Sequence, residues 1–182
     1  MSGKYSFHLQ SKDWRRDLPP KLIVGQRDNE TNSHVVLRLL GYLIFYRDRL
    51  HVGARLHNDN IPFEPDLVEL DYELRPRLWV ECGECGTPKL DKLAVKVPEA
   101  EIWVLKGSVV EGENLVRAMD RADLRRNRYH VIGLDEAMFA EVCGLLESRN
   151  KVFWLSGEFE PPNLQFDFNG LWFDAPFTVF HF

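Results

Sequence analysis

The 182-residue chain lacks the features that mark membrane, secreted and repetitive proteins. No apolar run approaches the roughly 18–20 residues that span a bilayer, and residues 1–10 have no apolar core typical of a secretory signal. Only three cysteines are present, an odd number that excludes a disulfide framework and suits a reducing compartment. No repeat, low-complexity tract or linker is visible. We therefore expect one cytoplasmic domain over residues 1–182 that does not associate with membranes.

An excess of positive charge is also absent. The net charge is −5 and the pI is near 5.7, which counts against a protein that coats nucleic acid nonspecifically through Lys and Arg. A nuclease is not excluded, because an acidic metal site adds negative charge and a basic surface can be local. The length and the ordinary composition, with 45% hydrophobic residues, permit a substantial core.

Hydrophobic periodicity predicts an α/β (α+β) fold with a central mixed β-sheet flanked by helices. The strongest helix is expected from about Glu30 to Arg49, with Asn29 as its cap. Further helices are expected over residues 88–97, 113–125 and 135–148. Strands are expected over residues 4–10, 20–25, 63–70, 77–82, 101–106, 129–133, 151–156, 164–168 and 171–180.

Two acids lie in neighbouring apolar stretches. Pro65-Asp66 opens one stretch, and Glu81 ends the run Leu78-Trp79-Val80-Glu81. If the two strands pair across Arg75-Pro76, alternation of side chains brings the carboxylates to one point. Carboxylate oxygens are the ligands that Mg²⁺ prefers, and a metal held there can activate water for phosphodiester hydrolysis. The alternative is that both are surface residues at strand ends, since most Asp and Glu side chains lie at the protein surface.

Several segments resemble the YaeQ family. Residues 30–43, Glu-Thr-Asn-Ser-His-Val-Val-Leu-Arg-Leu-Leu-Gly-Tyr-Leu, resemble its "ET…LRLLAWL" helix, and residues 79–83 resemble its "W-I-E-L-G" segment. Residues 88–93 lie where the family has a basic helix start. The N-terminal strand pair, the length and the aromatic β-rich tail are also similar, so the resemblance covers nearly the whole chain.

The YaeQ family is similar in fold to the PD-(D/E)XK, or restriction-endonuclease-like, nucleases. The resemblance implies an αβββαβ core with extra β-strands at the N- and C-termini and a metal site at one sheet edge. It implies a nuclease or phosphodiesterase in which Asp66 and Glu81 are catalytic and hold Mg²⁺ or Mn²⁺. Glu30 would be a third metal ligand, unless it is simply an acid favoured by the start of a helix.

The lysine of the superfamily motif is missing. Its position, two residues after Glu81, is Gly83. In some members of the superfamily the lysine comes from the next helix, where Lys89 and Lys92 stand, although both would also suit a solvated helix face. If neither reaches the acids, the alternative is a catalytically degenerate fold that serves as a nucleic-acid- or protein-binding module.

Arginines form two candidate surfaces for nucleic acid in this acidic chain. The larger set recurs at helical spacing, but the interleaved acids Asp120 and Asp123 favour a salt-bridged face over a phosphate-binding surface. The smaller set flanks Trp14, in a loop where an aromatic ring could stack on bases. The candidates are Arg117, Arg121, Arg125, Arg126, Arg15 and Arg16.

Cys82 and Cys85 form a Cys-x-x-Cys-Gly unit, the shape of one zinc knuckle. A structural zinc needs four ligands. Cys143 lies within an expected helix and the nearest histidines precede the strands, so the sequence argues against zinc. A redox pair and a simply packed turn remain alternatives.

The C-terminal third contains more Phe and Trp than one small sheet face would bury. We expect most of these rings to form the core of antiparallel strands. The remainder offers a surface for a protein partner or a homodimer.

Overall fold

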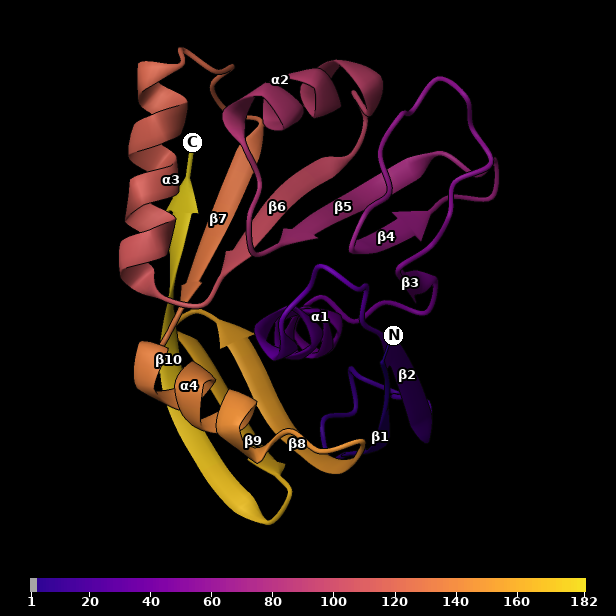
Figure 1. Ribbon diagram of the computed structural model, residues 1–182, viewed down its shortest axis with the longest axis vertical. Helices are drawn as coiled ribbons and strands as arrows, with labels where there is room; N and C mark the ends of the chain where they lie inside the picture. Colours follow the sequence, from indigo (N-terminus) through magenta and orange to yellow (C-terminus); the bar gives the residue numbers. More distant parts are fainter. Residues whose placement is uncertain (1–2) are drawn as a thin grey trace.

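The structure is a computed structural model that describes residues 3–182 (Figure 1). It contains four helices, α1 (Asn32–Ile44), α2 (Thr87–Lys96), α3 (Val109–Arg121) and α4 (Glu136–Leu145). The strands are β1 (Lys4–Ser11), β2 (Lys21–Gly25), β3 (Leu50–Val52), β4 (Leu67–Leu70), β5 (Pro76–Cys82), β6 (Glu101–Lys106), β7 (Tyr129–Leu134), β8 (Arg149–Phe159), β9 (Pro162–Phe168) and β10 (Leu171–His181). Within residues 3–182, no helix is both long and apolar enough to cross a membrane.

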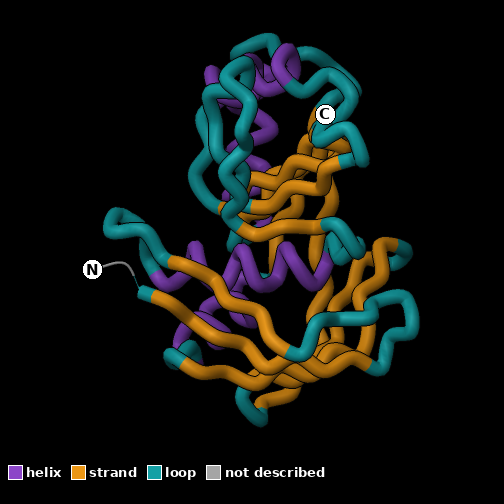
Figure 2. Tube along the Cα trace, turned by 90° about the vertical axis from the view of Figure 1, so that its right-hand side faces the viewer, coloured by secondary structure: helices purple, strands orange, loops and turns teal. Residues whose placement is uncertain are grey.

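The ten strands form one mixed sheet in the order β2-β1-β8-β9-β10-β7-β6-β5-β4-β3. Most neighbouring pairs are antiparallel, but β5, β6 and β7 run parallel to one another, as do β1 and β8. Figures 1 and 2 show the sheet curving around α1, so that the whole is nearly barrel-shaped. The expected mixed sheet with flanking helices is confirmed at this level.

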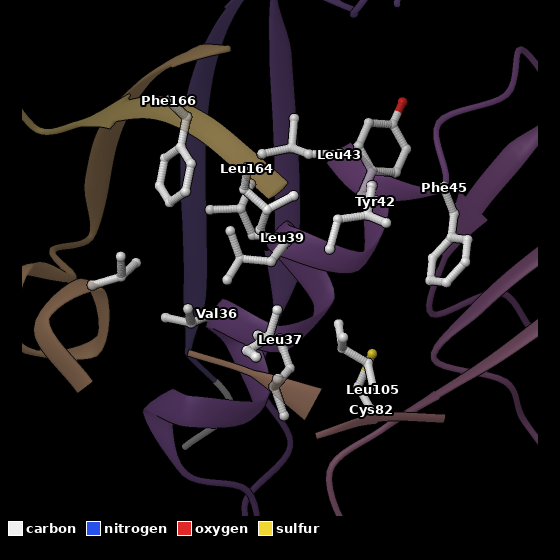
Figure 3. Packing of buried hydrophobic residues seen from close by; sticks show 14 of the residues in the cluster. Val36, Leu37, Leu39, Tyr42, Leu43, Phe45, Cys82, Leu105, Leu164 and Phe166 are labelled. Atoms are coloured by element: carbon white, nitrogen blue, oxygen red, sulfur yellow. The ribbon is translucent and has the colours of Figure 1, made fainter. Parts of the chain in front are cut away.

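Helix α1 lies inside the curved sheet and is buried from Val35 to Ile44. Figure 3 shows its apolar side chains between Leu164 and Phe166 on one side and Cys82 and Leu105 on the other. Because both sides of α1 meet strands, the helix is apolar nearly all round, which is typical of a fully buried helix.

A second apolar cluster lies on the opposite face of β5, β6 and β7, where α2 and α3 cover the sheet. Trp79, Ile102 and Tyr129 from the three strands are buried there against Leu90 and Met119 from the helices. These parallel strands are therefore buried on both faces, which explains their continuous apolar sequences.

The C-terminal aromatic residues mostly belong to the core around α1. Trp154, Phe166, Phe168, Phe173 and Phe177 are all buried. The prediction that most of these rings form the core of antiparallel strands is confirmed. Two neighbouring side chains at the β9–β10 turn, Leu171 and Trp172, are exposed.

The prediction of a helix from Glu30 to Arg49 was wrong at both ends. Thr31, and not Asn29, is the N-cap, so Glu30 lies in the preceding loop. At the other end, Arg16 donates Nε to the Leu43 carbonyl at 2.8 Å and Nη2 to the Ile44 carbonyl at 3.2 Å. A distant side chain thus satisfies carbonyls that a helix end leaves without partners.

The predicted helix over residues 113–125 was also displaced. Ser108 caps α3, because its Oγ accepts the Glu111 N–H at 3.1 Å, and the helix begins at Val109. It ends at Arg121, because Asp123 adopts the left-handed region with a φ of 52°. Arg125 therefore does not share a helical face with Arg117 and Arg121.

Candidate functional site

The antiparallel pairing of β4 with β5 brings Asp66 and Glu81 together. Leu67 lies opposite Val80 in the ladder, so the next position of the register sets Asp66 opposite Glu81. The Cys82 N–H donates to Asp66 Oδ2 at 2.7 Å across the same pair of strands. The predicted pairing across Arg75-Pro76 is confirmed, and both acids stand at the carboxyl end of β5.

Glu81 is a buried carboxylate with two fixed partners. Its Oε1 accepts the indole N–H of Trp79 at 2.8 Å, and its Oε2 accepts Lys89 Nζ at 2.8 Å. The Glu81 side chain is 4% exposed and that of Lys89 is 30% exposed. Burial raises the pKa of Glu81, and the charge of Lys89 offsets only part of that rise. One lysine of α2 therefore reaches the acids.

Lys92 lies apart from the Lys89–Glu81 ion pair. It follows Lys89 by three residues on α2, and its side chain is exposed. The structure thus brings together Asp66, Glu81 and Lys89 among the predicted catalytic residues, and leaves Lys92 on the solvent side of the helix.

Arg38 separates Glu30 from the two strand acids. It donates Nε to Asp66 Oδ1 at 2.8 Å and Nη1 to Glu30 Oε2 at 2.8 Å, and Nη2 pairs with Glu30 Oε1. The Arg38 side chain is only 5% exposed. Burial raises the pKa of Glu30. The hydrogen bonds from Arg38 and the Arg27 N–H lower it by more, so the net pKa is below its ordinary value.

Both carboxylate oxygens of Glu30 are therefore bound by Arg38, and Glu30 does not share a metal-binding point with the other two acids. Across residues 3–182, no three His, Cys, Asp or Glu side chains are grouped so as to hold a metal. The structure does not bring Glu30, Asp66 and Glu81 into one ligand set. What it does assemble is a pair of carboxylates, each held in place by a cation.

A cavity of about 570 Å³ opens where β5 and β6 end, and its lining does not include Asp66, Glu81 or Lys89. Gly83 lies at its edge with a φ of +86°, and a Cβ there would be 3.2 Å from His34 Nε2. Lys106 donates Nζ to the Gly83 carbonyl at 2.6 Å, and burial lowers the pKa of Lys106. The cavity is lined by Thr31, Ser33, His34, Leu37, Gly83, Glu84, Lys106, Gly107, Glu111, Asn114, Leu115 and Phe139.

Cys82 and Cys85 are both buried thiols. Burial raises the pKa of Cys85 to about 12, with a further contribution from the charge of Glu81. Burial also raises the pKa of Cys82 well above its ordinary value. Since the thiolate is the form that binds metal and attacks disulfides, the geometry favours the packed turn over a zinc or redox site.

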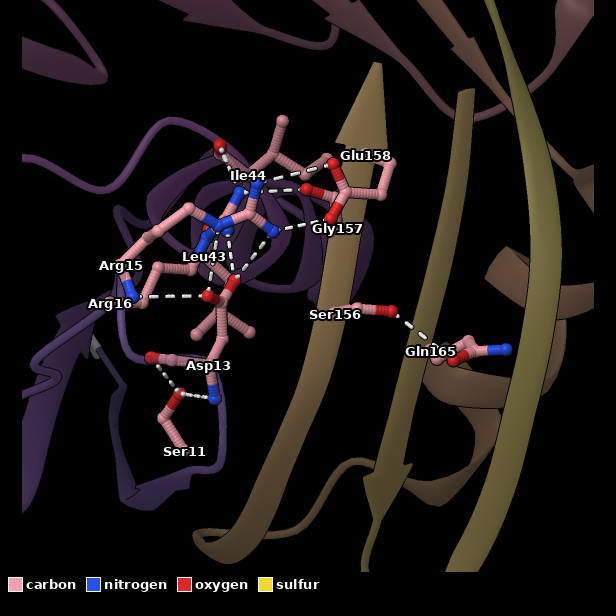
Figure 4. Close-up of polar contacts among 10 residues, drawn as sticks. All are labelled: Ser11, Asp13, Arg15, Arg16, Leu43, Ile44, Ser156, Gly157, Glu158 and Gln165. Atoms are coloured by element: carbon pink, nitrogen blue, oxygen red, sulfur yellow. Dashed lines mark hydrogen bonds and ion pairs between the residues drawn. The ribbon is translucent and has the colours of Figure 1, made fainter. Parts of the chain in front are cut away.

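Arg15 and Arg16 are engaged within the fold, as Figure 4 shows. Arg16 is buried and pairs with Asp13 while it donates to backbone carbonyls of α1 and to the Gly157 carbonyl at 3.1 Å. Arg15 donates Nε to Asp13 Oδ1 at 3.1 Å and pairs with Glu158. Trp14 remains 88% exposed.

The second arginine set is exposed and lies toward the carboxyl end of α3, whereas the amino end of α3 lines the cavity. Arg117 lies 3.8 Å from Glu113, and Arg126 pairs with Asp120. Ion pairs therefore occupy part of this set, as the salt-bridged interpretation expects.

Arg38 and Trp79 are the site residues that the sequence interpretation missed. Arg38 carried a signal, because it is the one charge between Val35 and Ile44 of the apolar helix. Trp79 stands two residues before Glu81 and so on the same face of β5. Neither signal identifies the partner, since Asp66 is 28 residues from Arg38 in the chain.

Comparison with known proteins agrees with this geometry at the level of the fold. The family model described as YaeQ protein matches residues 2–154. The crystal structure of YaeQ protein from Xanthomonas axonopodis pv. citri has a TM-score of 0.71 and 22% identity, covering 99% of this chain and 97% of that chain. The YaeQ protein from Pseudomonas syringae gives a TM-score of 0.73 and 15% identity, covering 100% and 96%. No curated protein matches the chain.

Proposed function

The chain belongs to the YaeQ family, and we propose that it acts within this fold as a metal-dependent phosphodiesterase of the nuclease type. The observation that carries the proposal is the position of Lys89, whose Nζ lies 2.8 Å from Glu81 Oε2. An ammonium group is thus present beside the two strand acids although position 83 is glycine. The chain order α1-β3-β4-β5-α2-β6 also has the αβββαβ pattern of restriction-endonuclease-like cores.

The donor set suits a hard divalent cation such as Mg²⁺ or Mn²⁺. Asp66 and Glu81 offer carboxylate oxygens, and Mg²⁺ is commonly bound by one or two carboxylates together with waters and substrate phosphate. Arg38 and Lys89 each pair with one of these carboxylates, and Glu30, which also pairs with Arg38, adds a third acid nearby. When bound, such a metal lowers the pKa of water and stabilises the charge that develops on a phosphodiester.

The chain's own residues provide the positioning. Trp79 and Lys89 fix Glu81, while Arg38 and the Cys82 N–H fix Asp66. The partly exposed ammonium of Lys89 can orient an attacking water or neutralise a phosphate oxygen as a point charge.

Gly83, two residues after Glu81, borders a cavity that has room for a nucleotide. Its volume of about 570 Å³ lies within the range of small-ligand sites. Leu37, Leu115 and Phe139 offer apolar surface for a base, and Lys106 and Asn114 offer donors for phosphate or sugar oxygens. The absence of a side chain at position 83 leaves room beside His34 and Leu37 in the cavity wall.

Three variants test the proposal with labelled single- and double-stranded DNA and RNA in Mg²⁺ or Mn²⁺. Asp66→Ala should lose both metal binding, measured by calorimetry, and cleavage. Lys89→Met should lower the cleavage rate by about 10²–10³-fold, while Asp66 still provides a metal ligand. Lys92→Met is the matched control and should cleave like the wild type, because its side chain is exposed on the same helix.

Cleavage by Lys89→Met at the wild-type rate would contradict the assigned role of Lys89.

The second candidate function is a catalytically degenerate fold that binds nucleic acid or protein. It is favoured by Gly83 and by the engagement of both Asp66 oxygens with Arg38 and Cys82. Wild-type protein that binds nucleic acid but cleaves none of the four substrates would support that alternative.

A further inference from the structure

Two histidines face each other on neighbouring strands, away from the acids. His130 of β7 and His181 of β10 are direct partners in the antiparallel ladder. Their Nδ1 atoms are 2.6 Å apart, and the ring centroids are 4.8 Å apart at an angle of 83°. His181 is exposed and His130 is half-buried. Both rings thus direct a nitrogen lone pair or proton to the same point at the surface.

Trp103 holds one of these rings in place. It is the ladder neighbour of His130 on β6, and the two rings are in contact, with centroids 4.6 Å apart and a tilt of 31° between the planes. Trp103 is itself buried, and its indole N–H donates to Glu101 Oε2 at 3.3 Å. His130 is therefore a fixed ligand position, whereas His181 can adjust.

From this juxtaposition we infer that His130 and His181 form a site for a divalent transition metal ion, Zn²⁺, Ni²⁺ or Cu²⁺. Neutral imidazole nitrogen is a preferred ligand for these ions. At a Zn–N distance of about 2.0–2.1 Å, two ligands of a tetrahedral ion stand about 3.3 Å apart. A small outward shift of the exposed His181 ring provides that separation.

The site would be open. No third His, Cys, Asp or Glu joins the two imidazoles among residues 3–182, so water or an outside ligand completes the coordination. Open positions are the mark of metal sites that bind or activate ligands and not of closed structural sites. Glu101 lies two residues from Trp103 and is now paired with Arg47 at 3.5 Å. Its half-exposed side chain is on the same face of β6 as Trp103 and is a candidate for an additional oxygen ligand.

A groove next to the histidines gives such a ligand somewhere to lie. It has a volume of about 250 Å³ and contains Trp103, the ring on which His130 stacks. Its lining consists of Ile44, Phe45, Tyr46, Arg47, Glu101, Trp103 and Phe159. Arg47 in this lining is paired with Glu69 at 2.7 Å and with Glu101 at 3.5 Å.

The site is chemically and spatially separate from the carboxylate pair. Trp103 and the histidines lie on the α1 face of the sheet, and Glu81 shares the other face with Trp79. Nitrogen ligands favour Zn²⁺, Ni²⁺ and Cu²⁺, whereas the two carboxylates favour Mg²⁺ or Mn²⁺. Failure of the proposed nuclease activity would therefore leave this inference intact.

The test is titration of the metal-free full chain with Zn²⁺ in a calorimeter, followed by electron paramagnetic resonance of the Cu²⁺ form. We expect one Zn²⁺ per chain and a Cu²⁺ spectrum with coupling to imidazole nitrogen. His181→Ala and His130→Ala should each weaken Zn²⁺ binding by more than about ten-fold. His8→Ala is the matched control, an exposed strand histidine, and should bind like the wild type.

His181→Ala keeps the test decisive if His130→Ala proves poorly folded, because His181 is exposed. Absence of Zn²⁺ binding by the wild type would overturn the inference. Binding that survives both substitutions would also overturn it, by placing the metal elsewhere. Asp66→Ala should leave Zn²⁺ binding unchanged, which keeps the two metal sites distinguishable.

Discussion

At the scale of single residues, one torsion angle governs where the lysine of the candidate site can stand. Gly83 has a φ of +86°, a region that costs other residues roughly 1–2 kcal/mol. A Cβ at this position would also press against His34 Nε2 at 3.2 Å. A lysine at position 83 is therefore strained in this backbone, and the ammonium group comes instead from Lys89 on α2.

The same substitution at two glycines tests this argument. We expect Gly83→Ala to lower the free energy of unfolding by about 1–2 kcal/mol. Gly144→Ala should raise it by about 0.5–1 kcal/mol, because Gly144 lies within α4 and a Cβ there meets nothing within 4 Å. Urea denaturation measures both values. Equal effects at the two positions would show that the torsion at Gly83 imposes no cost.

Much of the candidate site is predictable from local sequence. The alternation of apolar residues around Asp66 and Glu81, with a turn between them, is enough to pair the two carboxylates. The partners are not predictable in this way. Arg38 reaches Asp66 from a helix that precedes both strands, and a charge inside an apolar helix shows only that some partner must exist.

At the scale of secondary-structure elements, the ends of α1 show what local patterns leave undetermined. Apolar spacing continues past Ile44 to Tyr46, so the sequence alone extends the helix. The chain instead leaves the helix where Arg16 binds the carbonyls of Leu43 and Ile44. Strand positions were predicted more closely, because burial on both faces of β5, β6 and β7 produces unbroken apolar runs.

Replacing Arg16 tests its role at the end of α1. We expect Arg16→Met to lower the free energy of unfolding by at least about 2 kcal/mol, because three buried carbonyls and Asp13 lose a donor. Amide hydrogen exchange at Phe45, whose N–H bonds the Gly41 carbonyl at 2.9 Å, should accelerate. Unfolding measurements and exchange followed by NMR give the two readouts.

Arg15→Met is the matched control for that experiment. The Arg15 side chain is 45% exposed and pairs with Asp13 and Glu158. Exposed ion pairs contribute about 0–1 kcal/mol to the free energy of unfolding. Its loss should change stability by no more than that and leave exchange at Phe45 unaltered. Similar effects of the two substitutions would contradict the assignment of the helix end to Arg16.

At the scale of the whole molecule, the two ends of the chain complete one sheet. β1 runs parallel to β8, with Ser6 opposite Arg149, and β10 connects β9 to β7. The strands at both ends were predictable from their composition, but their order was not. β1 and β8 lie about 140 residues apart in the chain, and their pairing depends on how the whole sheet encloses α1. A local sequence pattern does not contain that information.

Asp13 joins three parts of this molecule and therefore links global stability to pH. It pairs with Arg16, which binds the end of α1 and the Gly157 carbonyl of β8, and with Arg15, which pairs with Glu158. Burial raises the pKa of Asp13, but the hydrogen bonds from Arg15 and Arg16 lower it by more, so the net pKa lies below 3.8. The folded state thus favours the ionised carboxylate.

A carboxylate with a lowered pKa stabilises the fold above its unfolded pKa and loses that contribution as pH falls through its folded pKa. We expect Asp13→Asn to cost about 3 kcal/mol at pH 7, because Arg16 is left with an unpaired buried charge. The difference between wild type and variant should persist down to about pH 4 and shrink below pH 3.8. Urea denaturation between pH 7 and pH 2.5 measures it, with the exposed Asp17→Asn variant as control. A difference that stays constant over this range would mean that Asp13 stabilises the molecule through packing and not through its charge.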